Sequence, residues 1–226
     1  SRDWSSDVCS SDLIDGKIIK ADTAAEHLWS STPERFLSQL DCSFLIVAHD
    51  RRNDRLTLIS DRFGSLPLFY SSGLGTFSAS SSFKRLFDQR GAGNSASVDP
   101  LVIAEFLYFR RVLNTATYDR NIHFLSGATV LSIDSAGAIE SRRYWSINGS
   151  KLGLSRDALA EILADELRRS MNTYMSDDKK FGLLLSGGLD ARALLAAASH
   201  PLTCFTTTPK PNNELSVAQE QARRSE

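Results

Sequence analysis

The chain of 226 residues has few cysteines, almost no net charge and no long apolar run. Its 26 lysines and arginines nearly balance 27 aspartates and glutamates, so charge gives no reason to expect a nucleic acid or an anionic membrane as partner. No stretch approaches the ~20 apolar residues needed to cross a bilayer. The three cysteines form no CxxC pair. We therefore expect reduced thiols, no disulfide framework and a cytoplasmic location.

The first residues of the chain resemble something other than natural protein. The run Arg2–Leu13 resembles the in-frame translation of a sequencing-adapter oligonucleotide, and residues 1–13 are excluded from fold reasoning as an artefact. A natural serine-rich leader is the alternative. On the adapter interpretation the chain is an internal fragment of a longer protein.

Residues up to about 148 favour β structure. Helices are predicted around 83–87 and over 101–109, the latter with Asp99 as cap and Pro100 in the first turn. The polar turn-forming run 148–151 marks the expected domain boundary, which gives domains at 14–148 and 149–226. Strands are predicted by apolar runs between turn signals over residues 44–50, 56–60, 66–70, 76–80, 129–133 and 138–145. The turn residues 51–55 and 134–137 predict two β-hairpins, each between the strands on either side of the turn.

The second half alternates helix and strand. A helix is predicted from the capping residue Ser155, and its apolar stripe is interpreted as core packing. The apolar run 181–185, an alanine-rich helical segment and a strand over 201–206 follow, which is typical of an α/β domain with a parallel sheet. The stripe consists of Leu159, Ile162, Leu163, Leu167 and Met171.

A glycine-rich turn, Ser186–Asp190, joins that apolar run to the alanine-rich helix. A turn of this kind aims backbone N–H groups and a helix N-terminus at one point, where a phosphate or pyrophosphate binds. No lysine follows the second glycine, so the loop is not of the Walker type. A tight turn with two glycines and no ligand is the alternative. The four histidines show no metal-ligand spacing and no partner carboxylate.

Several segments together resemble the glutamine-hydrolysing asparagine synthase family, in the family's order. They are Asp61–Tyr70, Leu125–Gly127 with Tyr144–Trp145, the loop Ser186–Asp190, and Asn213–Ala218. The loop itself resembles the PP-loop of ATP pyrophosphatases. By this resemblance residues 14–148 are a truncated glutaminase domain, a β-sandwich of the N-terminal-nucleophile type. Residues 149–226 are the start of an ATP-pyrophosphatase α/β domain with a parallel sheet.

The resemblance implies a ligase that adenylates a carboxylate with ATP, releases pyrophosphate and forms an amide with ammonia from glutamine. The implied cofactors are ATP and Mg²⁺. The implied partners are glutamine, aspartate or an analogue, and a second subunit in a homodimer. The fragment alone is expected to be inactive as a synthetase.

The resemblance also assigns site residues. Asp190 would hold Mg²⁺, with a helix cap as its alternative role, and Asp22 would bind glutamine unless it is a cap or surface residue. Neither Cys9 nor Cys42 can be the nucleophile, which in the family follows the initiator methionine. ATP and pyrophosphate would be bound by Ser186, Gly187, Gly188, Leu189, Asp190 and Arg192.

Two residues depart from the family pattern at the loop. Ala191 lacks the serine hydroxyl that the family usually places there, and Arg192 replaces a small residue. Arg192 could restore the lost pyrophosphate bond if it turns inward. This departure leaves open a divergent amide ligase or peptide and antibiotic cyclase with a non-functional glutaminase half, or a non-catalytic nucleotide-binding protein. Asp61, Arg62 and Gly64 are interpreted as architectural.

Overall fold

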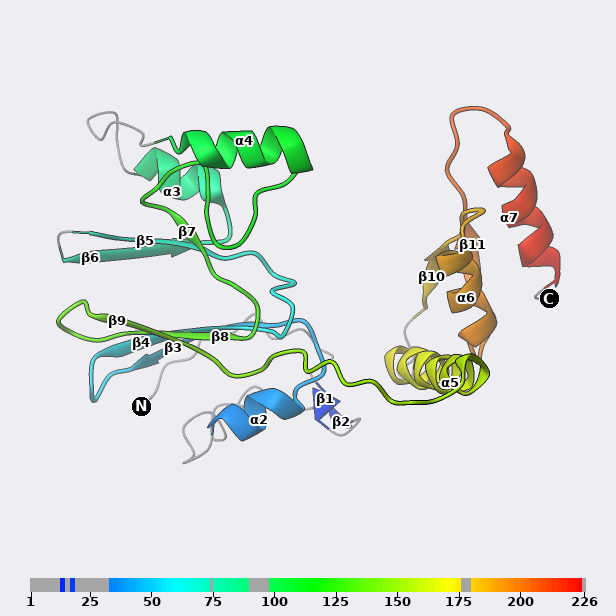
Figure 1. Cartoon of the computed structure of the whole chain (residues 1–226), viewed down its shortest axis with the longest axis horizontal. Coiled ribbons are helices and arrows are strands. Elements are labelled where there is room, and N and C mark those ends of the chain that lie inside the picture. The colour runs from blue at the N-terminus through cyan, green and yellow to red at the C-terminus, as the bar shows by residue number, and fades with distance from the viewer. Residues whose placement is uncertain are drawn as a thin grey trace. The chain divides into compact units, whose positions relative to one another are not determined.

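The computed structural model describes residues 13–14, 17–18, 33–73, 75–89, 98–175 and 180–224. Contacts between Cα atoms divide the chain into two compact units, Ser1–Asn148 and Gly149–Glu226, each of which is described by itself (Figure 1). Asp22 and residues 1–12 lie outside the described residues. No helix in the described part of the chain is both long and apolar enough to span a membrane.

A four-stranded antiparallel sheet forms the centre of the first unit. Its order is β3 (Leu45–Asp50), β4 (Arg55–Ser60), β8 (Thr129–Ile133) and β9 (Ile139–Arg143). Both predicted hairpins are confirmed: β3 pairs with β4, and β8 pairs with β9. Every residue of β8 is buried, as expected for a strand with neighbours on both sides and covered faces.

A second antiparallel sheet has the order β6 (Thr76–Ser80), β5 (Phe69–Gly73) and β7 (His123–Phe124). The predicted strand over 66–70 is wrong at its start, because β5 begins only at Phe69. Pro67 has no N–H to donate to a ladder, and the Leu68 carbonyl instead accepts a hydrogen bond from the Leu125 N–H at 2.8 Å. The short strands β1 (Leu13–Ile14) and β2 (Lys17–Ile18) pair separately.

Two apolar clusters lie on opposite faces of the four-stranded sheet. The first includes Leu58, Leu68 and Leu131 and joins the two sheets. The second includes Ile46 and Ala48 and packs against a helix, α2 (Pro33–Gln39), which the sequence did not predict. Since alternate side chains of a strand point to opposite faces, β3 contributes to both clusters, as its nearly uninterrupted apolar sequence suggests.

Two helices cover the outer face of the three-stranded sheet (Figure 1). They are α3 (Phe83–Gln89), which contacts β5 and β6, and α4 (Pro100–Phe109). The predicted cap of α4 is confirmed, because the Asp99 carboxylate accepts a hydrogen bond from the Leu101 N–H at 3.0 Å. The layers of unit 1 are therefore, in order, α2, the four-stranded sheet, the three-stranded sheet, and the helices α3 and α4.

The second unit combines three helices with a parallel strand pair. It runs α5 (Arg156–Tyr174), β10 (Gly182–Leu184), α6 (Leu189–Ala197), β11 (Thr203–Phe205) and α7 (Asn213–Arg224). β10 and β11 are parallel, with Leu183 opposite Cys204. Among the residues that the structure describes, its buried cluster contains Leu185, Ala191 and Ala218.

The interpretation of the α5 stripe as core packing is wrong for the described chain. α5 contains no buried residue, and Leu163 is 71% exposed. In the described part of unit 2, α5 contacts the helix α6, which lies beside a sheet of two strands. These elements offer too little surface to cover a helix of 19 residues.

Candidate functional site

The glycine loop lies where β10 ends and α6 begins, as the sequence predicts. Gly188 is the N-cap residue of α6 and provides no side-chain bond to the first turn. The Ser186 hydroxyl accepts a hydrogen bond from the Gly188 N–H at 3.2 Å, which leaves the hydroxyl proton itself able to donate. The first turn of α6 therefore has N–H groups that no N-cap side chain covers, at the positive end of the helix dipole.

Backbone bonds fix the base of this loop. Leu185 is buried, and its N–H donates to the Phe205 carbonyl at 2.8 Å. The Thr206 hydroxyl donates to the Leu185 carbonyl at 2.7 Å. Both bonds join Leu185 to the end of β11 or to the residue after it. The parallel strand pair therefore fixes the start of the loop that contains Gly187 and Gly188.

Position 187 leaves little room for a side chain. A Cβ added there would lie 3.3 Å from Cγ of Glu214 and 3.5 Å from its Cα. Glu214 is in the first turn of α7, so the N-terminal turn of a second helix packs against the loop. The segment Asn213–Ala218, which carries part of the family resemblance, forms the start of α7, but nothing in the sequence indicates that this turn contacts Gly187.

Charged side chains of both signs surround the loop. Asp190 and Glu214 are acidic residues in the first turns of α6 and α7. Arg192 is half-buried, and its Nε donates to the Gly188 carbonyl at 3.3 Å. This bond keeps the guanidinium beside the loop, next to Ala191, where the hydroxyl is missing.

The N–H and hydroxyl donors of the loop fit a phosphate ligand. Most of the oxygen atoms around Mg²⁺ would then come from that phosphate and not from the chain. Among the described residues, no three His, Cys, Asp or Glu side chains are grouped so that they could hold a metal ion. Mg²⁺ commonly binds through one or two carboxylates together with substrate phosphates. The exposed Asp190 can supply one such carboxylate.

A second constellation surrounds the buried carboxylate of Asp61 in unit 1. Asp61 is 1% exposed, and it accepts hydrogen bonds from the N–H groups of Phe44, Phe63 and Ser65 at 2.9–3.3 Å. The Ser65 hydroxyl donates to it as well. Since its acceptor sites are used internally, this carboxylate holds the turn after β4 and is not available to a ligand, which agrees with the architectural interpretation.

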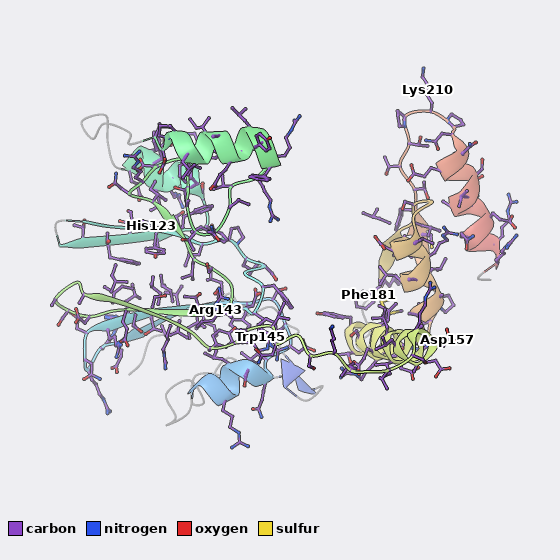
Figure 2. The ribbon with its side chains drawn as sticks, viewed as in Figure 1. His123, Arg143, Trp145, Asp157, Phe181 and Lys210 are labelled. Carbon is purple, nitrogen blue, oxygen red and sulfur yellow. The ribbon has the colours of Figure 1, made fainter. Side chains whose placement is uncertain are left out.

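Arg62 links that turn to the end of β9. Its guanidinium lies 5.6 Å from the ring centroid of Trp145, which is labelled in Figure 2, and 3.6 Å from the Asp41 carboxylate. It also donates to the Ser38 carbonyl, while its buried Nε has no partner among the described residues. The Arg62 guanidinium thus connects α2 with Trp145, which follows β9.

Tyr144 completes this cluster. Its hydroxyl donates to the Ser60 carbonyl at 2.8 Å. Burial of the ring raises the pKa of Tyr144 well above its ordinary value, and the nearby Asp61 charge raises it further. The phenol is therefore a hydrogen-bond donor throughout the ordinary pH range and no acid–base catalyst.

His49 has an acidic partner, and Cys42 packs against an apolar cluster. The expectation that no histidine has a partner carboxylate is wrong for His49, whose Nε2 lies 3.0 Å from Asp54 because the hairpin turn brings the two together. Both side chains are largely exposed. Cys42 packs against the α2 cluster and, like Cys204, is in no disulfide.

Comparison with known proteins identifies both units. Residues 18–145 match the glutamine amidotransferase domain family, and residues 162–226 match the asparagine synthase family. Asparagine synthetase [glutamine-hydrolyzing] 1 of Bacillus subtilis (strain 168) is 25% identical over 194 residues, which is 84% of this chain and 30% of that protein. Asparagine synthetase [glutamine-hydrolyzing] 2 of the same organism is 27% identical over 192 residues, 80% of this chain and 26% of that protein. The chain thus spans less than a third of either relative.

Proposed function

Because the chain belongs to the asparagine synthase family, with a glutamine amidotransferase domain, we propose that it is part of a ligase that forms an amide from a carboxylate, ATP and glutamine. Residues 14–148 are the glutaminase domain, of the N-terminal-nucleophile sandwich type. Residues 149–226 begin the ATP-pyrophosphatase domain. The substrates are glutamine and aspartate or an analogue, and the enzyme works in the cytoplasm.

The observation that carries this proposal is the loop between β10 and α6. Its two glycines, the helix N-terminus without a side-chain cap and the fixed strand end suit a pyrophosphate group. The loop also lies in a region that matches the asparagine synthase family, downstream of an amidotransferase match.

Each loop residue has a role in this proposal. The N–H groups of Gly187 and Leu189 and the hydroxyl proton of Ser186 donate to phosphate oxygens. Gly188 allows close approach because it lacks a side chain, although its own N–H already donates to Ser186. Asp190 holds Mg²⁺ through its carboxylate.

Arg192 provides the remaining positive charge. Its guanidinium is held beside the loop by the Gly188 carbonyl, and its other N–H groups can bind a phosphate oxygen in place of the hydroxyl that Ala191 lacks. Bound ATP supplies the adenylyl group that activates the carboxylate, with pyrophosphate as the leaving group. The chain's own residues orient the triphosphate and stabilise the charge on the pyrophosphate as it leaves.

For the amidotransferase half we propose a role for Asp22, as the residue that binds the amino group of glutamine. We assign no nucleophile within this chain. Cys42 follows Asp41 in a peptide bond and so has no free α-amine, which the N-terminal-nucleophile mechanism uses as its base.

A second candidate function is favoured by Ala191 and Arg192. A changed pyrophosphate contact suits a divergent ligase whose carboxylate substrate is not aspartate, such as a peptide or antibiotic cyclase. It also suits a nucleotide-binding protein without catalysis. These functions share the loop between β10 and α6. They differ in which carboxylate substrate is activated, or in whether one is activated at all.

Titration of the chain with ATP and with pyrophosphate, each with Mg²⁺, tests the proposal. We expect Ser186→Ala and Arg192→Gln to weaken binding about 10- to 100-fold, because each removes a charge-assisted hydrogen bond of about 1.5–3 kcal/mol. Arg169→Gln changes an exposed arginine of α5 that pairs with Glu166 and is the matched control. Equal affinities for all three variants, or no binding by the unaltered chain, would contradict the proposal.

A further inference from the structure

Unit 1 contains a cavity of about 470 Å³ at one end of its two sheets. The walls of the cavity come from three hairpins, β3–β4, β5–β6 and β8–β9, and the turn ends of these hairpins lie at the same end of the unit (Figure 1). The volume is within the range of about 300–1,000 Å³ that small-molecule sites occupy. β4 leads from Leu56, which lines the cavity, to the turn at Asp61 over roughly 17 Å. The cavity is therefore separate from the Asp61 cluster.

The floor of the cavity is apolar and comes from both sheets. Leu56 is opposite Ile133 on the neighbouring strands β4 and β8, and both pack in the apolar cluster that joins the sheets. From the other sheet, Phe77 of β6 lines the cavity, and its ring is stacked on the ring of Tyr70 with 6.0 Å between the centroids. The floor therefore offers a ligand aliphatic side chains from one sheet and an aromatic ring from the other.

The rim of the cavity carries two carboxylates. Asp54 lies in the turn between β3 and β4, and its Oδ1 is 3.0 Å from Nε2 of His49. Asp134 follows β8, and its Oδ1 accepts hydrogen bonds from the N–H groups of Ala136 and Ala138 at 3.0 and 2.8 Å. Both oxygens of a carboxylate are acceptors, so each of these carboxylates has an oxygen that these bonds do not use.

The positive charges near the rim are directed to other places. Among the described residues that line the cavity there is no lysine or arginine. Arg51 and Arg52 are in the same turn as Asp54 but do not line the cavity, and Arg55 pairs with Glu140 at 2.9 Å. A ligand in the cavity therefore meets two carboxylates and an imidazole above an apolar floor.

From these features we propose that the cavity binds a small organic cation, in which a primary ammonium group is attached to an apolar body. The ammonium group donates charge-assisted hydrogen bonds to the carboxylates of Asp54 and Asp134. The body packs on Leu56 and Ile133 and against the ring of Phe77, which also attracts the positive charge. A neutral molecule of the same shape lacks the charged contacts, and an anion faces two carboxylates. None of these residues has a part in the proposed glutamine or ATP chemistry.

Titration of the whole chain with three probes of similar shape tests the proposal. The probes are phenethylamine, phenethyl alcohol and phenylpropionate, and the amide chemical shifts of Gly75 and Gly137, which line the cavity, report where they bind. We expect the amine to bind about tenfold more tightly than the alcohol, and the anion not to bind. Equal affinities for the amine and the alcohol, saturable binding of the anion, or no saturable shift with the amine would overturn the proposal.

Asp54→Asn tests the contribution of the charge. Asparagine tolerates a positive φ such as the +45° of Asp54, and its side-chain oxygen can still accept a hydrogen bond from His49. Asp165→Asn is the matched control, because Asp165 is a carboxylate of α5 with similar exposure, 78% against 72%, and it also has a basic partner.

The two variants have different expected results. We expect Asp54→Asn to weaken binding of phenethylamine about tenfold and to leave the affinity for phenethyl alcohol unchanged, while the control changes neither affinity. An unchanged affinity for the amine in Asp54→Asn, equal losses for the amine and the alcohol, or the same loss in the control would overturn the proposal.

Discussion

At the scale of single residues, unit 1 depends on a close approach of two backbone segments. Gly127 lies against the turn that follows β4, and a Cβ added to it would lie 2.7 Å from the Arg62 carbonyl oxygen and 2.7 Å from the Phe63 carbonyl carbon. Ala128 beside it donates its N–H to the Asp61 carbonyl at 2.7 Å. The two segments are therefore joined at a separation that only glycine allows.

Gly127→Ala should destabilise the protein by about 2–4 kcal/mol, because backbone atoms and not a flexible side chain must move. Urea unfolding followed by tryptophan fluorescence measures the change. Gly137→Ala, at φ +80° but in open space, should cost only about 1 kcal/mol. Gly149→Ala, with open space and no positive φ, should be neutral. Equal effects at all three glycines would contradict the steric argument.

The phenol of Tyr144 gives a prediction for alkaline pH. Its pKa is raised in the folded state, chiefly by burial, so the folded state holds this proton more tightly than the unfolded state. The resulting stabilisation is fully present below the unfolded pKa of about 10 and is lost as pH rises above it. Tyr144→Phe should cost about 1 kcal/mol at pH 7, through the hydrogen bond to Ser60.

Urea unfolding from pH 7 to pH 11 tests this expectation. The unaltered chain should lose stability above about pH 10 more steeply than Tyr144→Phe does. Tyr108→Phe is the control, since Tyr108 is 86% exposed. Parallel pH profiles for the unaltered chain and Tyr144→Phe would show that this phenol does not cause the loss.

At the scale of secondary-structure elements, the helices of the two units are stabilised differently. α2 buries Phe36 and Leu37 against the sheet, so tertiary packing stabilises it despite its length of seven residues. α5 buries no side chain and depends more on its own sequence. Its cap is confirmed as Ser155, whose hydroxyl accepts a hydrogen bond from the Ala158 N–H at 3.2 Å.

Ser155→Ala should therefore destabilise α5 by about 1 kcal/mol, because it leaves an N–H group of the first turn without its acceptor. Hydrogen exchange of the α5 amides measures the effect where it arises. Ser170→Ala, at an exposed position inside the same helix, should be neutral or stabilising, since alanine has the higher helix propensity. Protection that falls equally in both variants would contradict a capping role.

At the scale of the whole molecule, the two units bury very different amounts of apolar surface. Unit 1 has two buried clusters, which take residues from the strands β3, β4 and β8 and from the helix α2. In unit 2, Leu184 is 77% exposed and Phe205 is 55% exposed, opposite one another on the parallel strand pair. The chain also spans less than a third of the length of its relatives. We therefore propose the complete ligase activity for a whole enzyme that contains these units, and not for the two units alone.

The sequence by itself determined the features that depend on neighbouring residues. Turn residues and apolar runs predicted the hairpins around Arg51–Arg55 and Asp134–Gly137, and the capping residues Asp99 and Ser155 predicted where two helices begin. The strand–glycine turn–helix pattern placed the glycine loop between β10 and α6. Each of these signals is complete within about ten residues, because turns and caps are satisfied by bonds to adjacent backbone groups.

Only the tertiary structure decided which distant groups meet. Asp61 accepts the N–H of Phe44, 17 residues away, and the start of α7 packs against Gly187. α2 forms against the sheet, and the outward face of α4 remains uncovered in unit 1. Local sequence carries no signal for such contacts, because they arise when the chain buries its apolar surface and when buried polar groups must find partners wherever the fold brings them.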